Sequence, residues 1–366
     1  MKAGVREIAK EAGVSLGTVD RALHGRAEVS AQTRQRVLEA ARRLGYQPNL
    51  TARALASARS TTRIGVCIPR QIRHFYDQVR DGILEEARRY AHLGVEVIYE
   101  PVPALGQGEA EALKQMFKDG VKAIILTPGQ PARLTPLIDE AEKRRGIRVV
   151  CVASDDSASA RSTAISVEPR LNGTLAAELM AKMSPPRARV AVVTGMLATE
   201  DHAHKVEGFA AGFERACPGG RMVAVIEDHQ SESESYGKCV QLLKRHTGLA
   251  GIYVSTANCL PVCRALADCG AEGRVRVIAT DIFPDAVPWF NSGVIAASIY
   301  QHPYVQGQTA IRLLVDHFQQ GAPLPAAHYL NPSLVLKANL RLFREIAAAS
   351  QPEGGAIDPA RSQPID

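Results

Sequence analysis

Residues 5–26 read VREIAKEAGVSLGTVDRALHGR and contain two short amphipathic helical patterns joined by a turn. Apolar residues recur at helical spacing on one side of each pattern, namely Ile8, Ala9 and Ala12 in the first and Val19, Ala22 and Leu23 in the second. Gly13 tolerates the positive φ that often follows a helix end. The Ser15 hydroxyl is suited to cap the second helix, because it accepts a hydrogen bond from an otherwise unpaired amide.

The second helical pattern leaves a largely polar face outward. This face consists of Leu16, Gly17, Asp20, Arg21 and His24. A buried first helix followed by a short second helix with an outward polar face is typical of the helix-turn-helix, whose second helix enters the major groove of DNA. An ordinary small helical bundle also contains alanines and a glycine turn, and it remains the alternative at this point.

The residues around and after this motif resemble the head of the lactose-repressor/galactose-repressor (LacI/GalR) family of transcription factors. The resemblance rests on GVSLGTV, on Arg21, and on Val29-Ser30 opening a third helix predicted over residues 32–44. It continues through GYQPN at residues 45–49 into a short helix-like run at residues 50–56. It is ordered and without gaps over about 56 residues.

The resemblance implies roles in DNA binding for individual positions. The implied contacts are Ser15, Leu16, Gly17, Thr18, Asp20, Arg21, Asn49, Ala52 and Leu55. Leu55 matches the leucine that family members wedge into the minor groove at the operator centre. The sequence departs from the family at Gly17, which offers no side chain, and at Asp20, which replaces the usual serine. The Asp20 carboxylate either accepts from a cytosine amino group or repels a phosphate.

The charge of the chain is concentrated in this head. Residues 1–63 hold 12 Lys and Arg against five Asp and Glu, a net +7, so the rest of the chain carries −1 of the total +6. A basic head on a nearly neutral body suits attraction to DNA phosphates. A solvated basic surface without a partner is the other interpretation of the same charges.

Length and composition indicate a globular protein of two or three domains. The chain has 366 residues, 46% hydrophobic and 22% charged, with no run long enough to span a membrane. Its start, MKAGVREIAKEAG, has no secretory signal. The seven cysteines follow no zinc or disulfide spacing, so we expect structural thiols, a reducing cytoplasm and neither metal nor cofactor. We therefore expect a cytoplasmic protein associated with the bacterial nucleoid.

From residue 63 onward, apolar strands alternate with amphipathic helices. Strands are predicted at residues 64–68, 95–99, 123–127, 148–152, 190–194, 222–226, 251–255, 275–280 and 294–299. Helices are predicted at residues 79–90, 109–118, 134–144, 171–183, 206–216 and 303–318. Buried strands separated by helices imply parallel sheets, and nine strands fit two doubly wound α/β lobes.

Ligands of such sheets bind at the carboxyl ends of the strands. The candidate ligand-binding residues at these ends are His74, Phe75, Tyr76, Gln130, Asp155, His202, Lys205, Thr256, Asn258, Asp281 and Gln301. Aromatic rings together with carboxylates and amides suit a sugar or polyol. This half of the chain resembles the periplasmic sugar-binding-protein fold, in its ribose-binding branch, through ATDIFPD at residues 279–285 and GVIAASIYQHP at residues 293–303.

That second resemblance implies that Asp281 and Gln301 contact sugar hydroxyls and that Phe75 stacks on the ring. His202 and Lys205 lie near the place where the branch often has an arginine, which the DHAHK stretch lacks. Instead of contacting the ligand, Asp281 could cap the N-terminus of a helix, and His202 could be a surface or capping residue. Asp155-Asp156 forms a paired carboxylate, which is also common in capping or hydroxyl-binding loops.

The sequence therefore predicts a homodimeric regulator that binds a pseudo-palindromic operator under the control of a sugar or polyol. It contains no phosphate-binding loop, dinucleotide fingerprint or nucleophile elbow, so we do not expect an enzyme. A sugar-modifying enzyme with a DNA-binding head and a ligand-independent architectural DNA binder remain alternatives. A periplasmic transport receptor would share the fold but not the DNA-binding head.

The predicted domains follow one another along the chain. They are a helix-turn-helix domain at residues 1–48, a hinge helix and linker at 49–62, an effector and dimerisation domain at 63–345, and a disordered tail at 346–366. Within the effector domain, the N-lobe is predicted at residues 63–166 and 300–330, and the C-lobe at residues 167–298 and 331–345.

Overall fold

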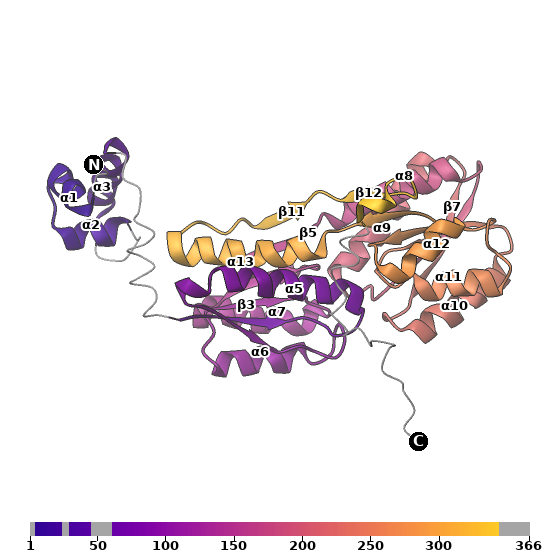
Figure 1. Ribbon diagram of the computed structural model, residues 1–366, viewed down its shortest axis with the longest axis horizontal. Helices are drawn as coiled ribbons and strands as arrows, with labels where there is room; N and C mark the ends of the chain where they lie inside the picture. Colours follow the sequence, from indigo (N-terminus) through magenta and orange to yellow (C-terminus); the bar gives the residue numbers. More distant parts are fainter. Residues whose placement is uncertain (1–3, 24–28, 45–60, 344–366) are drawn as a thin grey trace, which may run out of the picture.

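The computed structural model of the chain describes residues 4–23, 29–44 and 61–343 (Figure 1). Of the hinge and linker predicted at residues 49–62, residues 49–60 lie outside this description, as does the predicted disordered tail, and Thr62 already belongs to the first strand, β1 (Thr62–Cys67). The described residues form a small helical head and a much larger α/β body.

Three helices build the head around a small apolar core. They are α1 (Val5–Ala12), α2 (Leu16–Leu23) and α3 (Ala31–Arg43). Each helix contributes a completely buried residue to this core, namely Ile8, Val19 and Val37. The turn predicted after α1 is confirmed, because Gly13 has a φ of 62°. The Ser15 cap is also confirmed, since its Oγ accepts a hydrogen bond from the Thr18 amide at 3.1 Å.

Two six-stranded sheets form the body, which confirms the predicted pair of doubly wound lobes. The first has the order β11-β5-β4-β3-β1-β2 and the second β12-β10-β9-β8-β6-β7. The first sheet comprises β1 (Thr62–Cys67), β2 (Val95–Tyr99), β3 (Ala123–Leu126), β4 (Arg148–Val152), β5 (Thr163–Val167) and β11 (Ala327–Leu330). The second comprises β6 (Arg189–Thr194), β7 (Arg221–Glu227), β8 (Leu249–Val254), β9 (Arg276–Thr280), β10 (Ile295–Tyr300) and β12 (Ser333–Val335). Within the two sheets, neighbouring strands are parallel except for β12, which is antiparallel to β10.

Helices cover both faces of each sheet (Figure 1). In the N-lobe, α5 (Arg73–Arg89) and α13 (Pro303–Gln320) cover one face, and α6 (Glu109–Lys118) and α7 (Pro131–Glu140) cover the other. In the C-lobe, α8 (Pro169–Met183) and α9 (Glu200–Ala216) lie opposite α10 (Glu232–Arg245), α11 (Leu260–Asp268) and α12 (Val287–Ser292). Four shorter helices are η1 (Ala91–Leu93), η2 (Ala141–Arg145), η3 (Pro284–Ala286) and η4 (Leu340–Phe343).

The chain passes between the lobes three times within residues 61–343. It does so between β5 and α8, between β10 and α13, and between β11 and β12. β5, β11 and β12 were not among the predicted strands: β11 and β12 have only four and three residues, and β5 follows β4 with no helix between them. The predicted helices lack α10, α11 and α12, and they begin α5 and α9 six residues too late. The first turn of α9 carries Asp201 and His202 into the cleft, so its apolar periodicity starts only in the second turn. In α5, by contrast, Phe75 and Tyr76 of the first turn already pack in the N-lobe core.

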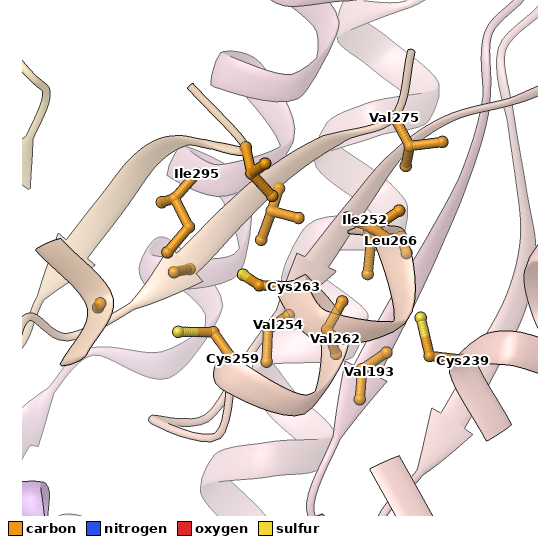
Figure 2. Packing of buried hydrophobic residues seen from close by; sticks show 14 of the residues in the cluster. Val193, Cys239, Ile252, Val254, Cys259, Val262, Cys263, Leu266, Val275 and Ile295 are labelled. Carbon is orange, nitrogen blue, oxygen red and sulfur yellow. The ribbon is translucent and has the colours of Figure 1, made fainter. Parts of the chain in front are cut away.

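The cysteines are part of the apolar cores. All seven are free thiols, and all except Cys269 are buried. In the C-lobe, Cys259 and Cys263 pack among Val254, Val262 and other aliphatic side chains of β8 and α11 (Figure 2). A buried thiol in such surroundings behaves as a small hydrophobic group.

Glycines set the contact between α8 and α9. A Cβ at Gly173 would lie 2.0 Å from the Lys205 carbonyl oxygen, and one at Gly208 would lie 2.2 Å from the Arg170 carbonyl oxygen. These distances are far inside van der Waals contact, so the two helix backbones meet only where neither carries a side chain. This close approach fixes the position of α9 relative to α8, and with it the position of Lys205 in the cleft.

Candidate functional site

A cavity of about 30 Å³ lies between the two lobes. Seven of the predicted ligand-binding residues line it: Phe75, Tyr76, His202, Lys205, Thr256, Asp281 and Gln301. Six other lining residues were not among the predicted ligand-binding residues, namely Leu105, Thr127, Ser154, Thr199, Asp201 and Gln230. Asp201 belongs to the first turn of α9, whereas the predicted helix began only at residue 206.

The lobes are closed on this cavity by direct hydrogen bonds across the cleft. The Gln71 side-chain amide donates to the Gln230 carbonyl oxygen at 2.7 Å, and the Thr199 hydroxyl donates to the Gly129 carbonyl oxygen at 2.8 Å. The Ser157 amide donates to Glu200 Oε2 at 2.9 Å. Ligand pockets commonly measure about 300–1,000 Å³, so the lobes must part before a small molecule can enter.

Buried charges form the floor of the cavity. Lys205 Nζ lies 2.7 Å from Asp201 Oδ2, with side chains only 3% and 6% exposed, and it donates to Gln301 Oε1 at 2.7 Å. The Gln301 backbone amide and side-chain amide donate to the two carboxylate oxygens of Asp281 at 2.8 and 2.7 Å. Burial raises the pKa of Asp281 to about 6, against the effect of these two hydrogen bonds.

Asp281 is held by the backbone in an unusual conformation. Its φ is 65°, and its carboxylate bonds to Gln301 at the end of β10 rather than to the amide of a following helix. The alternative of a simple helix N-cap therefore does not describe it. Ala153, Gln230 and Ile72 also line the cavity with positive φ values of 64°, 56° and 51°. Strained backbone of this kind tends to concentrate at binding sites.

His202 is neutral in this setting. Burial lowers its pKa to about 4, and the nearby Lys205 ammonium acts in the same direction. His202 Nδ1 lies 3.0 Å from the Met196 backbone nitrogen and 3.2 Å from the Met196 carbonyl oxygen, so the Met196 backbone holds the ring in place. The His202 ring is a buried part of the cavity wall, so the other interpretation, a residue on the protein surface, does not apply.

Four polar atoms around the cavity have no hydrogen-bond partner within residues 61–343. They are Thr127 Oγ1, Asp201 Oδ1, Gln230 Oε1 and Thr256 Oγ1. A buried polar atom without a partner costs about 1–3 kcal/mol, so such atoms are rare in folded proteins. Their gathering around one cavity indicates that a polar ligand or bound water completes the site.

The remaining four predicted ligand-binding residues do not line this cavity. A ring nitrogen of His74 contacts the Ala257 carbonyl oxygen, and its ring stacks on Phe283 with centroids 3.7 Å apart. The Asn258 amide donates to Asp228 Oδ2 at 2.8 Å. Gln130 stands at the N-terminal end of α7.

The fourth, Asp155, forms an ion pair with Arg161 and lines a separate cavity of about 270 Å³. The next residue in the chain, Asp156, is completely buried, and it accepts a hydrogen bond from the Thr135 hydroxyl at 2.8 Å. His74, Asp155 and Asn258 therefore bond to other protein groups, and none of the four residues lines this cavity.

The predicted DNA-binding residues that the structure describes lie on α2 and just before it. Ser15, Leu16 and Gly17 are exposed, with Leu16 48% exposed, while Thr18, Asp20 and Arg21 are half-buried. A shallow groove beside them is lined by Arg6, Lys10, Ser15 and Leu16, among others. Asn49, Ala52 and Leu55 lie outside the described residues.

A two-lobed α/β body with a polar inter-lobe cavity defines a ligand-binding protein, and a three-helix head with an exposed second helix defines a DNA-binding module. The family described as bacterial regulatory proteins, lacI family, matches residues 5–49, and the family described as periplasmic binding protein domain matches residues 64–322. The chain belongs to the periplasmic binding protein family and carries a lacI-family DNA-binding domain before it, which together define a DNA-binding transcriptional regulator.

Individual relatives support the same assignment. The chain is 28% identical over 328 residues to catabolite control protein A of Priestia megaterium, covering 87% of this chain and 94% of that protein. Among solved structures, it is similar to an ABC-transporter solute-binding protein from Burkholderia graminis in complex with D-arabinose, with a TM-score of 0.71 and 23% identity over 77% of this chain and 97% of that one. It is also similar to a glucose-galactose binding protein from Geobacillus stearothermophilus, with a TM-score of 0.69 and 24% identity over 77% and 99%. No helix in the described part of the chain is long and apolar enough to cross a membrane.

Proposed function

We propose that this regulator binds operator DNA as a homodimer and that a small sugar or polyol, held between the lobes, controls its affinity for the operator. The observation that carries the proposal is the set of four partnerless polar atoms around the inter-lobe cavity. Hydroxyl groups can both donate and accept, so a polyhydroxylated molecule satisfies such a set well. The rings of Phe75 and Tyr76 supply an apolar wall for its C–H face.

The similar solute-binding proteins are described as binding sugars, D-arabinose in one case and glucose or galactose in the other. We bring this chemistry to the present chain because its cavity lies between the lobes of the same fold. The closed cavity is smaller than a pyranose, so we infer that the lobes open, take up the ligand and close again. Ligand binding then favours one arrangement of the lobes over another. We expect this to change the free energy of operator binding by about 1–3 kcal/mol.

For the head we propose that α2 enters the major groove and that Ser15, Leu16, Gly17, Thr18, Asp20 and Arg21 contact the operator there. Asn49, Ala52 and Leu55 are proposed to bind the minor groove from the hinge. Two heads on a dimer match a pseudo-palindromic operator. The domain limits given in the sequence analysis, a cytoplasmic location at the nucleoid and the absence of enzymatic activity belong to the same proposal.

A ligand screen tests the proposal directly. The full chain is heated with individual sugars and polyols, and we expect one chemical group of them to raise the melting temperature by mass action. The same compounds should change operator affinity about 5- to 150-fold and be recovered unchanged after incubation. A compound that is converted to product would favour the enzyme alternative. Operator binding that no compound alters would favour the architectural DNA binder.

A further inference from the structure

The charges around the inter-lobe cavity bear on which sugars it can hold. Two carboxylates, Asp201 and Asp281, and one ammonium, Lys205, line it. Asp281 already accepts hydrogen bonds from Gln301 on both oxygens, and Lys205 is paired with Asp201 Oδ2. The one charged atom at the cavity without a hydrogen bond in the described chain is Asp201 Oδ1.

Two partnerless oxygens at the cavity, Asp201 Oδ1 and Gln230 Oε1, accept hydrogen bonds but cannot donate them. Asp201 Oδ1 comes from the first turn of α9, and Gln230 Oε1 from the turn before α10. Both residues are at least nine-tenths buried. A ligand that completes the site must therefore bring at least two donor groups to the cavity.

An anionic ligand does not meet this requirement. A phosphate or carboxylate group on a sugar offers only acceptors to Asp201 Oδ1 and Gln230 Oε1, and the donors that could meet it are the hydroxyls of Thr127 and Thr256, which carry no charge. The group would also add a negative charge to a site with two buried carboxylates and one ammonium. Lys205 gives little compensation, because two of its three N–H groups already point to Asp201 and Gln301. A buried charge without a partner costs about 3–5 kcal/mol.

The ion pair of Asp201 with Lys205 also disfavours a cationic ligand. Asp201 already shares its charge with an ammonium at 2.7 Å, so a second cation within hydrogen-bond reach of its other oxygen would lie close to Lys205. Hydroxyl groups bring donors without a net charge. They can also accept from the remaining N–H of Lys205.

We propose that Asp201 is a specificity-determining residue and that the effector is an uncharged, hydroxyl-rich molecule, with phosphorylated and carboxylated sugars excluded. This inference rests on the proposed function, since it assumes that the inter-lobe cavity is the effector site. It adds a residue that the sequence analysis missed and a chemical class that the sequence analysis left open.

Matched pairs of compounds test the charge selectivity on the full chain. Calorimetry is run with D-ribose and D-ribose 5-phosphate, D-glucose and D-gluconate, D-glucose and D-glucosamine, and D-fructose and D-fructose 6-phosphate. We expect at least one neutral member to bind, and its charged counterpart to bind about 100-fold more weakly or not at all. A charged member that binds as well as its neutral partner would overturn the inference while leaving the proposed effector site intact. No binding across the whole panel would overturn both.

Substitution of Asp201 tests its role with a matched control. Asp201→Asn keeps the shape but replaces Oδ1 or Oδ2 with a donor, and we expect the neutral sugar to bind about 10- to 100-fold more weakly. Asp156→Asn is the control, because Asp156 is as deeply buried but does not line this cavity, and it should leave sugar affinity within about threefold. Circular dichroism of both variants establishes that they are folded. Folded Asp201→Asn with unchanged sugar affinity would remove Asp201 from the site.

Discussion

Lys205 is the buried ammonium of an ion pair in the C-lobe, so its removal should destabilise that lobe. The change Lys205→Met keeps the length of the side chain and removes its charge. It leaves the Asp201 carboxylate, only 6% exposed, without the ammonium that lies 2.7 Å away. Breaking a buried ion pair from one side costs about 3–5 kcal/mol. That is a large part of the 5–15 kcal/mol by which a typical domain is stable.

Urea unfolding followed by tryptophan fluorescence measures this loss. The chain has a single tryptophan, Trp289, and it lies in α12 of the C-lobe, the lobe that also carries Lys205. We expect the loss at pH 8 to approach the full value. The exposed Lys182→Met on α8 is the matched control and should stay within about 0.5 kcal/mol of the original chain.

A second substitution separates the charge from the shape of the side chain. In the double variant Lys205→Met with Asp201→Asn no charge is left unpaired, so most of the loss should be recovered. If Lys205→Met costs less than about 1 kcal/mol, or if the double variant recovers none of the loss, the reasoning about a buried, paired lysine is wrong.

Further predictions concern the head, the cleft and the helix contact. Leu55→Ala should weaken specific operator binding and spare salt-dependent non-specific binding, and equal loss of both in a gel-shift titration would mean that Leu55 only supports the hinge. Arg21→Ala should cost about 1–3 kcal/mol and relax preference at one operator position, whereas uniform loss across sequences would assign it to a phosphate. Asp281→Asn should lower effector affinity by about one to three orders of magnitude in calorimetry and leave effector-free operator binding intact, since the head is separate. Between pH 6.5 and 4, Asp281→Asn should also lose more folding stability than the original chain. The lowered pKa of His202, about 4, means that acid destabilises the folded protein in this window. The raised pKa of Asp281, about 6, stabilises the folded protein by up to about 3 kcal/mol over the same window, and the variant lacks this compensation. Parallel pH profiles of the two proteins would contradict this sign. Gly173→Ala should destabilise the C-lobe by about 1–3 kcal/mol, because its new methyl group meets the Lys205 carbonyl oxygen, and an unchanged urea midpoint would mean that α8 and α9 part easily.

The sequence by itself determined the features that depend on local periodicity and local chemistry. The three head helices, the αL turn at Gly13 and the Ser15 cap follow from residues close together in the chain. The nine apolar strands and the two-lobe arrangement followed from the alternation of strands and helices. Asp281 and Gln301 could be placed in the cleft because each directly follows a buried strand of a parallel sheet.

Only the tertiary structure decided which side chains face the inter-lobe cavity. His74 and Asn258 stand at strand ends as Thr256 does, but their hydrogen bonds go to Ala257 and Asp228. Asp201 and Gln230 come from helix-opening segments whose polar residues have no periodic signal. They become a binding surface only when two distant parts of the chain close on each other. The partnerless atoms exist only in the closed, water-poor cleft, because in an open chain each of them would be hydrated.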